Sequence, residues 1–397
     1  MACGAGRDDP MTSVQTLAGK EIVVAVTGSI AAVETVKLIH ALRRRGASVQ
    51  TVMSSAAEGI ISPDALTYAS GMEAITRISG LVEHVTFCGD GGSADLLLIA
   101  PCTANTLSKI ACGIDDTPVT TFATTALGSK KPVLVVPAMH YSMYRHPALV
   151  ENIQKVKSWG VGIIEPRIEE GKAKIANTDE IVLRCERAIL GKPLAGKRVL
   201  ITSGACREAL DDVRVLTTRS SGQMGRALAL QAFRLGADVT VVHHDTFPCV
   251  TNLNADSAAD MRATVLLHLA EKNGTDIYIG AAAISDFAPE RQDAKIPSGK
   301  PATIRLSPLP KLLDEVIRKY SPLVVAFKLD REPDKKAKSM LGKGVALVLM
   351  NPPETMGSMH GDYVQLSASG RIPCSGSKEE IAAVIWETLL RDHLPAA

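Results

Sequence analysis

Two short stretches combine glycine and serine where a strand is expected to give way to a helix. The first is VTGSIAAVE (26–34), and the second is RSSGQMG (219–225). The first amides of a helix have no intrahelical acceptor and the helix dipole favours negative charge there, so each stretch could hold a phosphate. Neither carries the full GxGxxG pattern, and glycine in such a turn can also serve only to relieve crowding. The two stretches therefore predict phosphate sites only if other residues join them.

The elements that position these stretches occur twice. LAGK stands at 17–20 and again at 194–197, and an apolar run rich in β-branched residues follows each copy. Such a run is typical of a strand buried on both faces of a parallel sheet, and Gly46 and Gly236 would end the helices that follow. The expected strand, helix and strand lie at 21–27, 31–45 and 47–55 in the first copy, and at 198–204, 224–236 and 237–244 in the second. Each half thus begins with a βαβ unit.

The fold class predicted is α/β, with two consecutive doubly wound, Rossmann-like and mostly parallel sheets. A chain of 397 residues is long enough for two domains. We place them at 17–190 and 194–392, joined by the Gly- and Pro-containing AILGKPLAGK, with residues 1–16 as a flexible tail. Further apolar runs expected as strands lie at 94–101, 132–139, 276–283, 323–330 and 345–353.

Composition excludes several classes of protein. The formal net charge is +2 and aromatic residues make up 4%, which gives no basic, aromatic surface for nucleic acid. No apolar stretch approaches the roughly 18 residues of a membrane span, and the first sixteen residues do not resemble a secretion signal. The eight cysteines show no CxxC or zinc-type spacing, so we expect free thiols, no structural metal site and a cytoplasmic location.

The stretch PAMHYSM (137–143) resembles the PAMNxxM motif of flavin-dependent cysteine decarboxylases. TGSIAA (27–32), EHVTF (83–87) and APCTANTLSKIACGIDD (100–116) are similar to that family's flavin loop, active-site histidine and flavin-ring segment, in the same order. The resemblance implies FMN held by Gly28, Ser29, Ile30, Ser54, Thr103, Ala104, Asn105 and Thr106, and a substrate bound by Ala138, Met139, His140 and Met143. It also implies His84 as the catalytic acid and base, and His140 as a second catalytic residue.

The second half resembles phosphopantothenate–cysteine ligases. TSGACREALDDVR (202–214), RSSGQMG and GAAAISDF (280–287) are similar to the motifs TAGxTxExIDxVR, SSGKMG and AAVADY. Together the halves resemble the archaeal-type bifunctional enzymes of coenzyme A biosynthesis over about residues 17–390. The resemblance implies that a ligase half joins cysteine to 4'-phosphopantothenate with CTP through an acyl-cytidylate. It implies that a flavoprotein half then decarboxylates phosphopantothenoylcysteine to 4'-phosphopantetheine.

The same resemblance assigns the ligase residues. Lys295 and Thr218 would be catalytic, and Mg²⁺ would accompany the triphosphate, with its protein ligands left open. CTP would be bound by Ser220, Ser221, Gly222, Asp286, Lys295, Pro310, Lys311, Leu312, Leu313, Phe327 and Lys343. The partners implied are 4'-phosphopantothenate, cysteine and phosphopantothenoylcysteine, and further copies of the chain in a homo-oligomer built on trimers and up to a dodecamer.

The chain departs from the family pattern at several positions. His140 replaces an asparagine that binds the substrate carboxylate in the family. The family's clamp segment contains a proton-donating cysteine, but the matching stretch EPRIEEGKAKIANTDE (165–180) has none. Candidate donors are Lys172 and Lys174 within the stretch, and Cys102 and Cys112 outside it. In the ligase half Thr218 replaces an asparagine, Gln223 replaces a loop lysine, and Ser339 stands beside Lys338 where a lysine is expected.

Two alternatives stay open, the first favoured by the substitutions at Thr218, Gln223 and Ser339, and the second by the βαβ openings that such enzymes share. One is a single-activity flavin-dependent decarboxylase whose second half is a degenerate nucleotide-binding module, and pyrophosphate release from CTP would decide the matter. The other is a plain dinucleotide-dependent oxidoreductase. That class needs an acidic residue at the end of the second strand, where TVMSSAAE (51–58) has serines.

Overall fold

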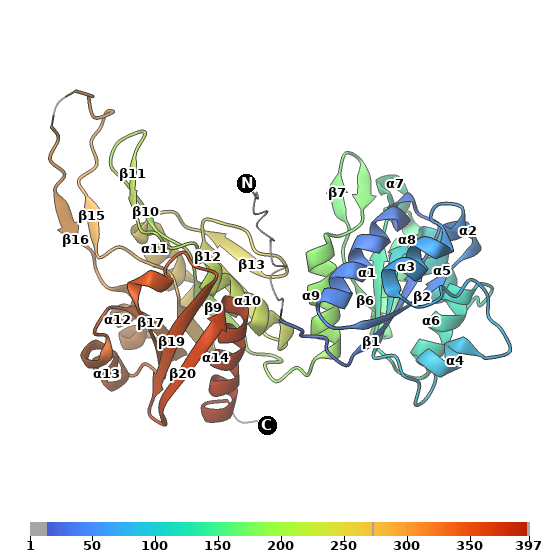
Figure 1. Ribbon diagram of the computed structural model, residues 1–397. Helices are drawn as coiled ribbons and strands as arrows, with labels where there is room; N and C mark the ends of the chain where they lie inside the picture. The colour runs from blue at the N-terminus through green and yellow to red at the C-terminus, as the bar shows by residue number, and fades with distance from the viewer. Residues whose placement is uncertain (1–13, 272–273, 300, 395–397) are drawn as a thin grey trace, which may run out of the picture. The chain divides into compact units, whose positions relative to one another are not determined.

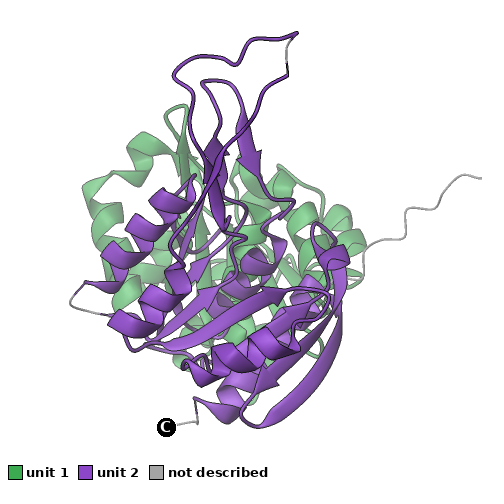
Figure 2. Cartoon of the chain, turned by 90° about the vertical axis from the view of Figure 1, so that its left-hand side faces the viewer, with its two compact units in different colours: residues 1–190 green, residues 191–397 purple. Residues whose placement is uncertain are grey.

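The computed structural model describes residues 14–271, 274–299 and 301–394, and residues 1–13 of the expected tail lie outside this range. The chain divides into two compact units, 1–190 and 191–397 (Figure 2). Within the described residues, no helix has both the length and the apolar character needed to span a bilayer.

Unit 1 is a five-stranded parallel sheet in the order β2-β1-β3-β4-β6, with helices on both faces (Figure 1). Successive side chains of β1 enter different cores: Ile22 and Val24 belong to one apolar cluster and Val23 and Ala25 to the other. Both faces are covered, which is why the strand contains no polar alternation. The elements are β1 (Glu21–Val26), η1 (Ile30–Glu34), α1 (Thr35–Arg44), β2 (Ser48–Met53), α2 (Ser55–Glu58), α3 (Pro63–Ser70), α4 (Glu83–Cys88), β3 (Leu96–Cys102), α5 (Ala104–Cys112), α6 (Pro118–Gly128), β4 (Val133–Pro137), β5 (Met139–His140), α7 (Tyr141–Tyr144), α8 (Pro147–Ser158), β6 (Gly162–Ile163), β7 (Arg167–Glu169), β8 (Lys172–Lys174) and α9 (Thr178–Ile189).

Unit 2 is an eight-stranded sheet in the order β13-β12-β9-β14-β17-β18-β19-β20. Its pairs are parallel up to β18, after which β18–β19 and β19–β20 are antiparallel. Helices α10 and α14 cover one face, where the indole of Trp386 donates to Leu228 O at 3.0 Å. The elements are β9 (Arg198–Thr202), β10 (Arg207–Ala209), β11 (Val215–Thr217), α10 (Gln223–Arg234), β12 (Asp238–His243), β13 (Thr251–Asn254), α11 (Ala258–Leu269), β14 (Ile277–Gly280), β15 (Phe287–Pro289), β16 (Leu306–Pro308), α12 (Leu312–Lys319), β17 (Leu323–Leu329), α13 (Asp334–Gly342), β18 (Leu347–Asn351), η2 (Pro353–Thr355), β19 (His360–Ser367), β20 (Gly370–Ser377) and α14 (Lys378–Asp392).

The predicted fold class is confirmed, since both sheets are mostly parallel and both units begin with the expected βαβ order. Two expectations need correction in detail. The helix expected at 31–45 begins as the 3₁₀ turn η1 and becomes α-helical only at Thr35. The antiparallel edge β19–β20 was not predicted, and neither were the small hairpins β7–β8, β10–β11 and β15–β16.

Candidate active sites

Unit 1 contains a cavity of about 690 Å³ at the carboxyl ends of its strands. This volume falls within the roughly 300–1,000 Å³ of small-molecule sites, and the location is where open α/β sheets bind ligands. Predicted site residues that line it are Gly28, Ser29, Ile30, Thr103, Ala104, Ala138, Met139, His140 and Met143. Three motifs that are far apart in the sequence therefore meet at one cavity.

Hydrogen bonds tie the three loops together. The Thr27 hydroxyl donates to Pro101 O at 2.8 Å and accepts from the amide of Thr103 at 3.0 Å. The Ser29 hydroxyl donates to Ala138 O at 3.1 Å. The flavin-loop motif, the flavin-ring segment and the PAMH motif are thus fixed relative to one another.

The residues present fit a phosphorylated cofactor such as FMN. The hydroxyl of Ser54, next to β2, is buried and has no hydrogen-bond partner in the structure. The first amides of η1 and α5 also have no intrahelical acceptor. Ser54, Asn105 and Thr106 do not line the cavity itself. Thr106 is occupied locally, because its amide donates to the Thr103 hydroxyl at 3.2 Å as a helix cap.

His84 lies outside this cavity. It is the second residue of α4, and its ring meets that of Phe122 edge-on at 6.5 Å. Its Nδ1 is buried without a partner. The structure of one chain therefore brings His140, but not His84, to the cavity wall.

A three-stranded sheet, β5-β8-β7, brings the candidate donors Lys172 and Lys174 to the cavity wall, together with Arg167, which sequence reasoning missed. His140 stands opposite Lys172 in this sheet, and Lys172 stands opposite Glu169. Side chains directly opposite share one face, so His140 and Lys172 point to the same side. Lys174 is held between Glu170 and Glu169, and these carboxylates raise its pKa. These strands are too short for their alternation to group the residues from sequence alone.

The thiols considered as substitutes for the absent clamp cysteine are placed elsewhere. Cys102 is fully buried at the end of β3, and burial raises the pKa of its thiol. Cys112 is exposed at the end of α5, and neither cysteine lines the cavity. Burial and a raised pKa both disfavour the reactive thiolate, so we do not assign the donor role to Cys102.

Unit 2 has its own cavity of about 530 Å³. Of the predicted nucleotide residues, those that line it are Thr218, Ser220, Ser221, Gly222, Asp286, Pro310, Lys311, Leu312, Leu313, Phe327 and Lys343. Gln223 lines it as well, whereas Lys295, Lys338 and Ser339 do not.

The glycine-rich loop packs closely on the end of β9. Gly222 has a φ of +71° at the N-cap of α10, and the Ser203 hydroxyl donates to its carbonyl at 3.1 Å. A Cβ on Gly225 would lie 2.2 Å from that hydroxyl. Glycine is thus needed at both positions for α10 to point its first amides into the cavity.

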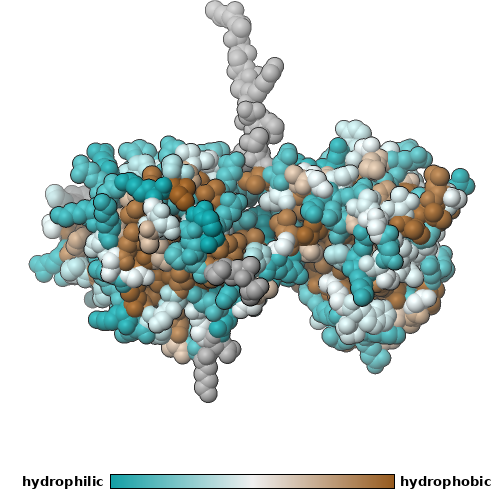
Figure 3. Space-filling view, turned by 90° about the horizontal axis from the view of Figure 1, so that it is seen from below, coloured by the Kyte–Doolittle hydropathy of each residue, from teal (hydrophilic) through white to brown (hydrophobic). Residues whose placement is uncertain are grey.

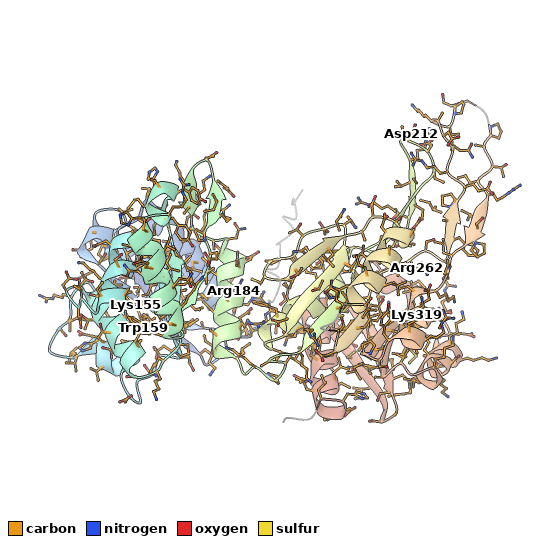
Figure 4. All side chains as sticks on the ribbon, turned by 180° about the vertical axis from the view of Figure 1, so that it is seen from behind. Lys155, Trp159, Arg184, Asp212, Arg262 and Lys319 are labelled. Carbon is orange, nitrogen blue, oxygen red and sulfur yellow. The ribbon has the colours of Figure 1, made fainter. Side chains whose placement is uncertain are left out.

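Lys295 lies on an arm that extends from unit 2. The hairpins β10–β11 and β15–β16 form this arm (Figure 1), and Asp212 marks its outer part in Figure 4. Arg291 pairs with Asp212 at 3.0 Å, and the amide of Gln292 donates to Leu210 O at 2.9 Å. The segment that carries Lys295 is therefore bound to the β10–β11 hairpin and not to the cavity wall.

Several residues of the second cavity were missed by sequence reasoning. Among them, Asn351 ends β18, Thr355 lies in η2, Tyr363 lies on β19 and Lys378 begins α14. No group of three His, Cys, Asp or Glu residues suited to a metal ion occurs in the part of the chain that the structure describes.

Comparisons with known proteins agree with these two units. Residues 11–189 match the Flavoprotein family, and residues 194–392 match the family described as DNA/pantothenate metabolism flavoprotein C-terminal domain. A solved C-terminal domain of a coenzyme A biosynthesis bifunctional protein CoaBC is 28% identical, covering 50% of this chain and 96% of that one, with a TM-score of 0.43.

Two curated relatives match over nearly their whole length. The coenzyme A biosynthesis bifunctional protein CoaBC of Thermococcus kodakarensis is 42% identical over 95% of this chain and 96% of its own. That of Methanocaldococcus jannaschii is 35% identical over 95% of this chain and 94% of its own. The chain belongs to the family of coenzyme A biosynthesis bifunctional proteins.

Proposed function

We propose that the cavity of unit 1 is the active site of a phosphopantothenoylcysteine decarboxylase that binds FMN, and that the cavity of unit 2 is the active site of a CTP-dependent phosphopantothenate–cysteine ligase. The chain is a bifunctional enzyme of coenzyme A biosynthesis with these two activities. One observation carries the assignment to the cavities: in each unit, motifs that are distant in the sequence converge on a single cavity. The product of unit 2 would be the substrate of unit 1.

In unit 1 the loop residues Gly28–Ile30 and the start of α5 would hold FMN through backbone amides, and Ser54 through its free hydroxyl. When bound, FMN supplies a two-electron acceptor for the substrate thiol, which makes loss of the carboxylate as CO₂ possible. His140 would donate a hydrogen bond to that carboxylate, and Ala138, Met139 and Met143 would shape the wall around it. Lys172 adds a positive charge on the same face as His140.

His84 would move the thiol proton, because an imidazole ring has one nitrogen that can accept a proton and one that can donate it. Since His84 lies outside the cavity of its own unit, we propose that a second copy of the chain brings its His84 to this cavity. Residues near His84 in the chain are apolar and exposed, with Leu81 78% and Val85 46% exposed. Figure 3 shows that apolar residues also reach the surface elsewhere, on the face seen from below. A homo-oligomer built on trimers, as the family resemblance implies, would cover Leu81 and Val85.

In unit 2 the carboxylate of 4'-phosphopantothenate would attack the α-phosphorus of CTP, and pyrophosphate would leave. The cysteine amine would then attack the acyl carbon, and CMP would leave. Lys311 and Lys343 would neutralise charge on the triphosphate, and the Ser220–Gly222 loop would donate amides to it. Thr218 would bond the acyl-cytidylate. Lys295 would reach a triphosphate from its arm.

Mg²⁺ would enter with the triphosphate. The carboxylates in the cavity wall are Asp286 and Asp314, and Asp314 already pairs with Lys343 at 3.0 Å. Two separate carboxylates suit an ion that keeps most of its waters and binds phosphate oxygens.

The test is to incubate the purified protein with 4'-phosphopantothenate, cysteine and one nucleoside triphosphate at a time. We expect a flavin absorption band, pyrophosphate release with CTP, and mass spectra of phosphopantothenoylcysteine followed by 4'-phosphopantetheine. Decarboxylation of supplied phosphopantothenoylcysteine without any pyrophosphate release would favour the single-activity alternative. A colourless protein that remains inactive with added FMN would refute the assignment of unit 1.

A further inference from the structure

A buried lysine in the second cavity has no part in the reaction described above. Lys378 is 6% exposed and is the first residue of α14. A cation at the start of a helix meets the positive end of the helix dipole, and the residues that follow it, Glu379 and Glu380, are the acidic type expected there. Burial lowers the pKa of its ammonium group. Burying a lysine at this end of a helix costs free energy of folding. A residue type that is unfavourable at its position in the fold commonly has a function there.

The ammonium group has two protein acceptors. Its Nζ donates to the Tyr363 hydroxyl and to Thr355 O at 3.4 Å. Lys378 forms no ion pair with any of the residues that the structure describes. An ammonium group has three donors, so one remains, and Lys378 lines the cavity.

The surroundings of Lys378 suit a planar ring. Its Nζ lies 4.6 Å from the centroid of the Tyr363 ring, and the Tyr363 ring meets the ring of Phe327 edge-on at 6.4 Å. The Thr355 loop is itself fixed, since Asn351 donates to the Thr355 hydroxyl at 2.7 Å. Aromatic walls and one fixed donor are the features by which proteins recognise a base, whereas the expected phosphate contacts lie at the glycine-rich loop and the exposed lysines.

We propose that Lys378 selects the nucleobase, by donating its remaining N–H to the C2 carbonyl oxygen that pyrimidines carry and adenine lacks. This inference rests on the proposed nucleotide function of unit 2. A site built to bond a particular acceptor discriminates strongly against a ligand without it, because the buried donor is then left unpaired.

The first experiment compares Lys378→Met with the wild type by pyrophosphate release with CTP, UTP and ATP. Methionine keeps the unbranched stem and loses the donor. We expect kcat/KM to fall at least about tenfold with CTP and with UTP, while the value with ATP stays within about twofold. Lys335 lies on the exposed face of α13, outside the cavity, and Lys335→Met removes one positive charge there. This control should leave the ratios of kcat/KM between CTP, UTP and ATP unchanged. If Lys378→Met lowers kcat/KM equally with all three nucleotides, or with none of them, the proposal is overturned in favour of a structural role.

The second experiment keeps the wild-type fold and changes the ligand. 2-Thio-CTP replaces the C2 oxygen by sulfur, a weaker acceptor, so the wild type should use it at least about tenfold less well than CTP. Lys378→Met should show little difference between the two nucleotides, because the donor is already absent. If the sulfur substitution lowers kcat/KM by the same factor in Lys378→Met as in the wild type, the two losses are independent and a direct bond is contradicted. If the wild type releases pyrophosphate from no nucleotide, the proposed function of unit 2 fails. That outcome is distinct from failure of the Lys378 proposal, in which the wild type remains active with CTP.

Discussion

The amide of Ile296 donates to the carboxylate of Asp211 at 2.9 Å, which joins the segment that carries Lys295 to the turn of the β10–β11 hairpin. The same carboxylate accepts from the amides of Val213 and Arg214 and pairs with the Arg214 guanidinium at 2.6 Å. Arg214 in turn donates to Ile296 O at 3.2 Å. One buried aspartate thus joins the β10–β11 hairpin to the residue next to Lys295.

This relationship predicts the effect of Asp211→Asn on ligation. Asparagine keeps one side-chain oxygen as an acceptor, but its second oxygen becomes an NH2 group that cannot accept a hydrogen bond. The Lys295 segment should therefore lose its fixed position. We expect kcat/KM for pyrophosphate release to fall by about tenfold to a hundredfold, the range for a displaced contributing group. Decarboxylation of supplied phosphopantothenoylcysteine should be unchanged, which a CO₂ assay checks. Asp238→Asn at the exposed start of β12 is a matched control in the same unit. Ligation unaffected by Asp211→Asn would show that Lys295 does not depend on this contact.

Asp211 also predicts how unit 2 responds to acid. The backbone hydrogen bond from Ile296 and the other donors hold the pKa of this carboxyl well below its ordinary value of about 3.9. A carboxyl with a lowered folded-state pKa stabilises the fold above its unfolded pKa, and this stabilisation is lost as the pH falls through the folded value. The midpoint of urea unfolding should therefore drop between about pH 4 and pH 2 in the wild type. Asp211→Asn should show a smaller drop over the same interval, measured by circular dichroism, and an equal drop would refute the assignment.

His84 should be required for one activity only. His84→Ala removes the group expected to move the thiol proton, so CO₂ release should fall by about a hundredfold to ten-thousandfold. Pyrophosphate release by unit 2 should stay unchanged, as should both activities in His40→Ala on α1. A mixture of His84→Ala with a variant inactivated at His140 should recover part of the decarboxylation if His84 acts on a second copy. Absence of recovery in mixed oligomers would place His84 and His140 in one subunit's site.

Much of this arrangement could be predicted from sequence, and the rest depends on contacts that no short pattern encodes. The turn at Gly28 and the loop at Gly222 were found because glycine and serine at a helix start have a local physical reason. Lys378 was missed because the role proposed for it depends on its burial beside Tyr363 of β19 and Thr355 of η2, which belong to no motif. Lys295 was grouped with the cavity residues by resemblance, but its segment is bound to the β10–β11 hairpin. Strands as short as β5 and β8 give too few residues for an alternation to be recognised.

Gly225→Ala should destabilise unit 2, because the new Cβ would lie 2.2 Å from the Ser203 hydroxyl and 2.5 Å from its Cβ. Crowding of this kind costs about 1–3 kcal/mol, and the loop would move away from the end of β9. We expect a lower urea midpoint for unit 2 and a raised KM for the nucleotide. Gly342→Ala places a methyl group where no atom lies within 4 Å, and it should leave the stability nearly unchanged. Equal midpoints for the two variants would show that the loop relaxes at no cost.

Truncation after Gly191 should separate the two activities. The apolar clusters of unit 1 are built entirely from residues before this point, so their burial does not require unit 2. The fragment should bind FMN, show its absorption band and decarboxylate supplied phosphopantothenoylcysteine, while pyrophosphate release should be absent. The complementary fragment from Gly191 onward retains the apolar cluster formed around Leu200 and Tyr278, and it should ligate without colour. Because each fragment keeps the strands, helices and cavity of its own unit, loss of both activities from both fragments would mean that an active site needs residues from each unit.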